Sequence, residues 1–247
     1  MIYITGDTHG DYTRINDKKL SHLGKDDYLI ISGDFGFVFA ADEKGIRKEN
    51  KRLDEMEKLN FNIIFLEGNH DNYLRICSFP EVEKFANKCH KIRNNIYHLE
   101  RGRAYTIQGK KFFVLGGAAS MDIYKRTPYI SWWKEELPSK QEYERAVETL
   151  KEHGYIFDYI LTHTAPIEAI KILGFNPYLT DDMELTSFLS YIMESCCFEC
   201  WYFGHFHTDE TFEYSKTNIF SSSRTSNEID YQTKHFRALL NDFVKIE

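Results

Sequence analysis

The sequence lacks a long hydrophobic run and lacks an excess of basic residues. A membrane-spanning helix needs about 20 consecutive apolar residues, and no stretch of the 247-residue chain approaches that length. We therefore expect no membrane span, and because no basic leader precedes the first apolar run we expect a cytoplasmic protein. The net charge of −7 argues against a nucleic-acid partner, since such binding depends on clustered Lys and Arg. It leaves open a small phosphorylated substrate that metal ions hold.

Cysteines are few, and linkers and repeats are missing. The chain has five cysteines, an odd number, which fits a reduced compartment better than a disulfide framework. With 42% hydrophobic residues the composition is too apolar for a disordered chain. No low-complexity tract or heptad array divides the sequence, so we expect residues 1–247 to form a single domain. The sequence does not indicate an oligomeric state.

What the sequence does contain is a set of apolar runs that stop at glycine. Three runs, residues 1–5, 27–32 and 61–66, end at Gly6-Asp7, Gly33-Asp34 and Gly68-Asn69. Two later runs, residues 157–162 and 200–203, end at His163 and at Gly204-His205-Phe206-His207. Short apolar runs bounded by turns indicate strands buried on both faces, and ligands bind at the carboxyl ends of such strands.

Helical patterns alternate with these strands. We expect helices over residues 12–23, 45–59, 139–153 and 181–194, with Asp11 and Ser139 as N-caps. Between residues 82 and 117 short strands and a hairpin turn at 108–110 indicate a largely antiparallel sheet packed against the first. Residues 212–246 are expected to add strands that close this second sheet. The sequence thus predicts an α/β protein.

Polar side chains follow five of the predicted strands. They are Asp7, His9, Asp34, Asn69, His70, Asp71, His163, His205 and His207. Carboxylate oxygens, an amide oxygen and imidazole nitrogens together suit Mn, Fe, Co, Ni or Zn, whereas an all-oxygen set would indicate Mg or Ca. The pattern therefore predicts a transition-metal site at the strand ends.

These motifs resemble, in order, the signature of the calcineurin-like metallophosphoesterases: D-x-H, GD, GNH[DE], H and GHxH. The resemblance covers Asp7 to His207. It implies a four-layer α/β/β/α sandwich of two mixed β-sheets with helices on the outer faces. It also implies two divalent metal ions, with Mn expected to serve in vitro. One would be held by Asp7, His9, Asp34 and His207, and the other by Asp34, Asn69, His163 and His205.

The resemblance implies an enzyme that hydrolyses phosphoesters through a metal-activated hydroxide. His70 would be the general acid for the leaving group, and Asp71 would orient its imidazole. A phosphomonoester or phosphoprotein is the favoured substrate. The alternatives are a phosphodiesterase acting on a cyclic nucleotide or nucleic acid, which the acidic charge disfavours, and a non-catalytic binding scaffold, which would be expected to have lost ligands.

The chain departs from the protein Ser/Thr phosphatases of this superfamily. Those enzymes carry GDxVDRG and GNHE followed by Ser-Arg, whereas here Asp71 is followed by Asn72-Tyr73. The phosphate-binding arginines of that branch are missing, which favours a stand-alone bacterial or phage-type member. Arg75, Arg126 and Arg224 are candidate substitutes. The aromatic segment 121–133, with Arg126 and Trp132, is either a lid that binds substrate or a cover for the sandwich edge.

Overall fold

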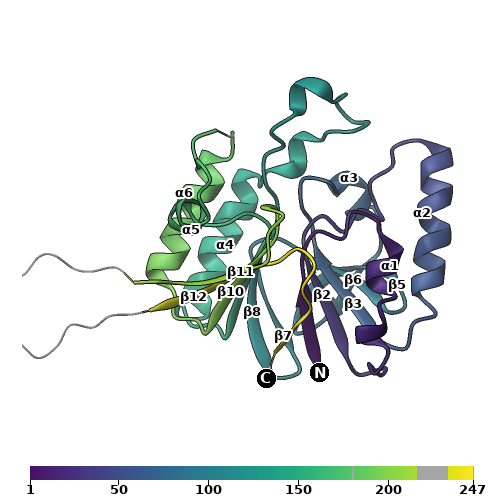
Figure 1. Cartoon of the computed structure of the whole chain (residues 1–247), viewed down its shortest axis with the longest axis horizontal. Coiled ribbons are helices and arrows are strands. Elements are labelled where there is room, and N and C mark those ends of the chain that lie inside the picture. The colour runs from purple at the N-terminus through teal and green to yellow at the C-terminus, as the bar shows by residue number, and fades with distance from the viewer. Residues whose placement is uncertain (180, 216–232, 247) are drawn as a thin grey trace, which may run out of the picture.

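Two β-sheets pack face to face, and helices cover their outer faces (Figure 1). The structure, a computed structural model, describes residues 1–179, 181–215 and 233–246. The first sheet has seven strands and the second has six. This arrangement confirms the expected α/β/β/α sandwich.

The first sheet has the strand order β13-β1-β2-β3-β6-β5-β4. Its central strands β1, β2, β3 and β6 run parallel, as expected for strands joined through helices. The strands are β1 Ile2–Thr5, β2 Tyr28–Ser32, β3 Asn62–Leu66, β4 Glu81–Lys84, β5 Asn87–Arg93, β6 Ile96–Leu99 and β13 Val244–Ile246.

The second sheet has the order β11-β12-β10-β9-β8-β7. Here β8, β9, β10 and β12 are parallel, and β7 pairs with β8 through the predicted hairpin turn. The strands are β7 Arg103–Ile107, β8 Lys110–Leu115, β9 Tyr159–Thr162, β10 Cys200–Phe203, β11 Glu210–Tyr214 and β12 Lys234–Ala238.

Alternation of side chains explains why the strands are apolar throughout. Ile30 and Ile64 point between the sheets, where they join one core with Val114 and Leu161 of the second sheet. Their neighbours on the same strands, such as Ile31, point outward into a second core beneath the helices. Because both faces are covered, no strand position of this part of the sheet favours a polar residue.

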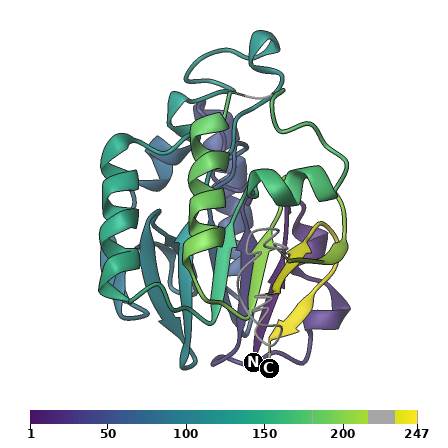
Figure 2. The same ribbon diagram turned by 90° about the vertical axis from the view of Figure 1, so that its left-hand side faces the viewer.

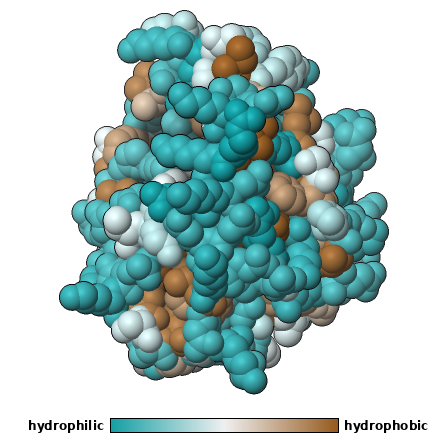
Figure 3. Space-filling model, turned by 90° about the vertical axis from the view of Figure 1, so that its right-hand side faces the viewer, coloured by the Kyte–Doolittle hydropathy of each residue, from teal (hydrophilic) through white to brown (hydrophobic). Residues whose placement is uncertain are grey.

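Helices cover the two outer faces (Figures 1 and 2). On the first sheet lie α1 Tyr12–Ile15, α2 Glu43–Met56 and α3 Tyr73–Ile76, and on the second α4 Lys140–Glu152, α5 Ile167–Ile172 and α6 Met183–Ser195. Asp11 and Ser139 cap α1 and α4 as predicted. The side covered by α2 is mostly hydrophilic (Figure 3). Within the described residues, no helix has the length and apolar character needed to span a membrane.

Two expectations about strand pairing are corrected by the structure. Strands β4 to β6 extend the first sheet instead of belonging to the second, and β13 pairs with β1 instead of closing the second sheet. The pattern of apolar residues shows which faces are buried, but not which distant strand is the neighbour. The expected strand at 219–221 lies outside the described residues.

The helix expected over 12–23 ends at Ile15, and a short 3₁₀ turn, η1 Lys18–Leu20, follows. The Asp17 side chain accepts a hydrogen bond from the Lys19 backbone, a local bond that competes with a continuous helix. The long segment between β8 and α4 contains two 3₁₀ turns, η2 Ile123–Lys125 and η3 Lys134–Glu136. It rises beyond the ends of the strands (Figure 1).

Candidate metal centre

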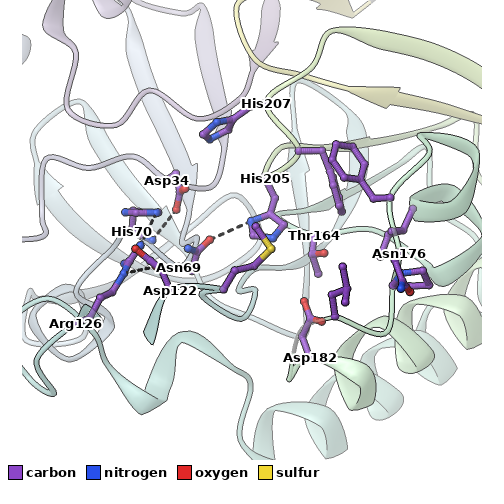
Figure 4. Close-up of a pocket in the computed structure, with 16 residues that line it drawn as sticks. Asp34, Asn69, His70, Asp122, Arg126, Thr164, Asn176, Asp182, His205 and His207 are labelled. Carbon is purple, nitrogen blue, oxygen red and sulfur yellow. Dashed lines mark hydrogen bonds and ion pairs between the residues drawn. The ribbon is translucent and has the colours of Figure 1, made fainter. Parts of the chain in front are cut away.

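Five strand ends, three from the first sheet and two from the second, meet at one site. The loops after β1, β2 and β3 carry Asp7 and His9, Asp34, and Asn69 and His70, while those after β9 and β10 carry His163, His205 and His207. Figure 4 shows several of these side chains converging on one pocket. The structure therefore brings together all seven predicted metal ligands.

The loops achieve this convergence through unusual backbone conformations. Five of the predicted ligands have positive φ: Asp7, His9, Asp34, His205 and His207. Such conformations are rare for non-glycine residues and concentrate at functional sites. At Gly68 a β-carbon would lie only 2.2 Å from Asp34 Oδ1 and 2.6 Å from His163 Nε2. Glycine is thus required there for the two sheets to approach this closely.

Asp34 lies at the middle of the site. His9 Nε2 is 3.6 Å from one of its oxygens, Oδ2, and His163 Nε2 is 3.3 Å from the other, Oδ1. Two groups of possible ligand atoms share this carboxylate: Asp34 with His9 and His70, and Asp34 with Asp7 and His163. In each group the ligand atoms lie within 4.8 Å of one another. A shared carboxylate between two such groups is the geometry that a bridging ligand requires.

The remaining predicted ligands also point inward. The Nε2 atoms of His9 and His207 are 3.1 Å apart. Asn69 Oδ1 is 3.1 Å from both His163 Nε2 and His205 Nδ1. Asp7 Oδ2 is buried and has no hydrogen-bond partner among the described residues. An orphaned carboxylate oxygen beside converging imidazole nitrogens fits a site that holds cations.

The pKa values of the side chains at the site also indicate that it favours bound positive charge. Although burial disfavours the charged imidazolium, Asp34 and Asp7 raise the pKa of His163 to about 10. Burial, and then the charge of Asp34, raises the pKa of Asp7 to about 6. Burial lowers the pKa of His205 to about 3, which keeps that imidazole neutral and able to bind a metal. The residues present therefore fit divalent transition-metal ions.

Hydrogen bonds from outside the cluster orient two of the predicted ligands. His163 Nδ1 is 3.0 Å from the Ser32 carbonyl oxygen, so its Nδ1–H donates there and Nε2 is the nitrogen that faces Asp34. Asn69 Nδ2 donates to Ser120 Oγ at 3.1 Å, and Ser120 Oγ donates to Glu136 Oε2 at 2.7 Å. This chain turns the amide so that its oxygen faces the histidines.

Ser120 and Glu136 were missed by the sequence analysis. They bracket the segment 121–135, and the Ser120 backbone N–H also donates to Glu136 Oε1 at 2.8 Å. The apolar run 111–115 ends at Gly116-Gly117, and apolar runs that end at glycine also precede the predicted metal ligands. This pattern indicates that the segment after Gly117 could approach the site. Nothing in the local pattern identifies Glu136.

Asp71 has a different role from the predicted one. Its carboxylate accepts hydrogen bonds from the backbone N–H groups of Phe35, Gly36 and Gly68 at 2.8–3.1 Å. Both oxygens are thus used to join the loops after β2 and β3, and the His70 imidazole is not among their hydrogen-bond partners in the described structure. The prediction that Asp71 orients His70 is corrected: Asp71 shapes the loops that carry Asp34 and Asn69.

The loop after β3 rests on a buried charge cluster. The Glu67 side chain is fully buried and pairs with Arg101, while His98 Nε2 lies 2.5 Å from its Oε2. Burial opposes ionisation of Glu67, but Arg101 and then His98 outweigh it and lower its pKa to about 2. Arg101 also lies over the Tyr73 ring at 4.3 Å. This network fixes the residue that precedes Gly68-Asn69-His70.

Of the predicted substrate-binding residues that the structure describes, only Arg126 reaches the site. Its Nη2 lies 3.1 Å from His70 Nε2, and its Nε donates to Asp122 at 2.6 Å. Arg75 instead pairs with Glu49 and donates to the Ala40 carbonyl, because the short α3 directs it toward α2. Trp132 does not line the pocket that contains His70. Arg224 lies outside the described residues.

A cavity of about 470 Å³ adjoins the cluster. One side is formed by Asp34, Asn69, His70, His205 and His207. Arg126 and Asp122 lie beside His70, while Thr164, Asn176 and Asp182 lie on the other side of His205 (Figure 4). A substrate that reaches the cluster therefore has room for a sizeable organic group.

A comparison with models of protein families agrees with the geometry. The family model described as calcineurin-like phosphoesterase matches residues 1–209. No curated protein sequence matches the chain. Among solved structures, the phosphopantetheinyl hydrolase from Mycobacterium tuberculosis is similar with a TM-score of 0.47 and 14% identity, over 97% of this chain and 89% of that chain.

Proposed function

The chain belongs to the calcineurin-like phosphoesterase family, whose members are metal-dependent phosphoester hydrolases, and we propose that it hydrolyses a phosphomonoester, either of a small molecule or of a protein. The observation that carries this proposal is the position of Asp34, which is shared by two groups of possible metal ligands. We propose a single domain acting in the cytoplasm; the odd number of cysteines supports the reduced compartment.

The proposed ligand sets are those that the family resemblance implies; the distances support the pairing of His9 with His207 and of Asn69 with His163 and His205, whereas Asp7 lies in the group of Asp34 and His163. Asp34 would bridge two divalent ions. Asp7, His9 and His207 would complete the first set, and Asn69, His163 and His205 would complete the second. When bound, two such ions polarise phosphoryl oxygens and supply a hydroxide nucleophile at neutral pH.

The remaining steps are proposed for side chains around the cluster. His70 faces the cavity, and its backbone N–H donates to Asp34 Oδ1 at 2.7 Å, which anchors the backbone of His70 beside the metal ligands. From there it would donate a proton to the leaving oxygen. Arg126 places a guanidinium next to His70, where it would attract the phosphoryl group. Asp122 holds that guanidinium in place.

The test is an assay with added Mn²⁺ on p-nitrophenyl phosphate and on bis(p-nitrophenyl) phosphate. We expect metal-dependent turnover, with the monoester the better substrate, and an unchanged rate for a His22→Ala control, since His22 lies outside the cluster. A strong preference for the bis-ester would instead assign a phosphodiesterase. Stoichiometric metal with no turnover of either ester would contradict catalysis and favour a binding scaffold.

A further inference from the structure

The cavity beside the metal centre has a second, apolar wall that the chemistry of hydrolysis does not explain. This apolar wall consists of Met121, Ile170, Phe175, Pro177, Leu179 and Phe206. Met121 is 72% exposed, Leu179 is 74% exposed and Phe175 is 47% exposed. Large apolar side chains that gather exposed around one cavity indicate a binding surface, whereas single exposed ones need no explanation.

The apolar wall begins next to the predicted metal ligands. Phe206 lies between His205 and His207 in the sequence, and its ring centroid is 5.2 Å from that of His205. The Phe175 ring lies 5.3 Å from Phe206, tilted by 43°. A phosphate bound at the cluster would therefore direct its ester group toward two aromatic faces, which favour aromatic and apolar guests.

The charges around the cavity exclude a highly charged guest. Arg126 is the only cationic Lys or Arg among the lining residues that the structure describes, and it is paired with Asp122. Besides Asp34, the lining carboxylates are Asp122, which pairs with Arg126, and Asp182. A second phosphate group, or a nucleic-acid strand, would thus find no spare cation here.

We propose that the substrate is a monoester of phosphate with an apolar, aromatic alcohol, and that Phe175, Leu179 and Met121 select it. This inference rests on the proposed phosphomonoesterase function and narrows it. The phosphoryl group would bind at the metal centre and the organic group would pack against the apolar wall. Each methylene buried there improves binding of the ester up to about fourfold.

The experiment uses a series from phenyl phosphate to 4-butylphenyl phosphate with the metal-loaded protein. The phenol leaving group changes little along this series, so differences report burial of the alkyl group. We expect kcat/KM to rise with alkyl length in the wild type. We expect the rise to flatten in Phe175→Ala and Leu179→Ala, so that the loss of kcat/KM relative to the wild type grows with alkyl length.

Tyr178→Ala is the matched control, because Tyr178 is an exposed aromatic residue of the same segment that does not line the cavity. In Tyr178→Ala, kcat/KM should rise with alkyl length as it does in the wild type. A flat or falling series in the wild type would overturn the inference, as would an equal loss in Tyr178→Ala.

A binding measurement separates this inference from the proposed function. Non-hydrolysable 4-alkylphenyl phosphonates are titrated into the metal-loaded protein by calorimetry. Affinity that rises with alkyl length in the wild type and not in Phe175→Ala supports the apolar wall even if no ester is hydrolysed, in which case the proposed function alone fails. Turnover of phosphomonoesters with no dependence of phosphonate affinity on alkyl length leaves the function standing and overturns the apolar wall.

Discussion

The two walls of the cavity are built in different ways. The metal-facing wall comes from tight loops that directly follow parallel strands, and its carboxylates Asp7 and Asp34 are buried. The apolar wall comes largely from the long segments before α4 and after α5, and three of its side chains, Met121, Phe175 and Leu179, are exposed. Rigid strand ends can hold ligands in fixed geometry, whereas surface loops tolerate change. The comparison suggests that the chemistry is fixed by the sheets and the substrate preference by the loops.

The largest effect is expected at the centre of the metal-facing wall. Asp34→Asn removes the charge that both groups of ligands share, so both metals should bind weakly. Since the metals supply several kcal/mol of transition-state stabilisation, we expect activity to fall by at least about 1,000-fold. The variant is assayed on p-nitrophenyl phosphate with Mn²⁺.

Asp122→Asn is a control for Asp34→Asn, because Asp122 lines the same cavity but belongs to neither ligand group. Metal content should stay at the wild-type level in this control. If Asp34→Asn kept wild-type activity, the metal-facing wall would not be the catalytic one.

His70→Ala should separate the chemistry of the leaving group from metal binding. We expect turnover of an alkyl phosphate to fall by about 100-fold or more, because its leaving oxygen needs a proton. p-Nitrophenyl phosphate, with a better leaving group, should be much less affected, and metal content should be unchanged. An equal loss on both esters would argue against His70 as the general acid.

The next prediction concerns how the stability of the folded protein depends on pH through Glu67, which supports the loop after β3. The pKa of Glu67 is lowered to about 2 in the folded protein, so its contribution to stability is present above the unfolded value of about 4.5. It is lost as pH falls from about 4.5 toward about 2, and amounts to at most about 3 kcal/mol. Urea unfolding of the metal-free protein at several pH values measures this slope. Glu67→Gln should have a shallower slope over that interval, and an identical slope would contradict the role of Glu67.

A smaller effect is expected at Ser120, which links Asn69 of the metal-facing wall to Glu136 of the segment before α4. Ser120→Ala removes the hydroxyl that orients Asn69, so we expect Mn²⁺ affinity to fall by about tenfold. Thr149→Val is the matched control, since it removes a buried hydroxyl that donates to Gly102 far from the cluster. If the two variants lost thermal stability alike and kept equal metal affinity, Ser120 would be structural only.

The smallest effect is expected for Arg126→Ala. Because Arg126 contacts His70 but no predicted ligand, we expect a severalfold higher KM for the phosphomonoester with unchanged metal content. Arg75→Ala is the comparison, since that side chain pairs with Glu49 away from the cavity. An unchanged KM in Arg126→Ala would remove Arg126 from substrate binding.

The same contrast explains what the sequence could predict. The strands and their polar ends were recognisable because burial on both faces leaves a continuous apolar run, and Asp34 or His163 interrupts it at a turn. The strands that lie next to β6 and β13 could not be recognised, because strand pairing depends on contacts between residues far apart in the sequence. Asp71 was misassigned because adjacency to His70 in sequence does not bring the two side chains together.

Apart from Met121, which belongs to the candidate lid segment 121–133, the apolar wall was not anticipated. Phe175 and Leu179 lie in a segment without periodicity, and an exposed apolar residue in such a segment resembles any other until the fold places it beside the metal centre. Glu136 was missed for a related reason, since its carboxylate acts on Asn69 only through Ser120. Residues that act through long loops leave no local pattern.

The most direct test of the central claim is the position of bound metal. A crystal of the protein soaked in Mn²⁺ is measured by anomalous diffraction. We predict two peaks on either side of the Asp34 carboxylate, one near His9 and His207 and the other near His163 and Asn69. A single peak away from Asp34, or full metal occupancy that leaves Asp34 uncoordinated, would contradict the account.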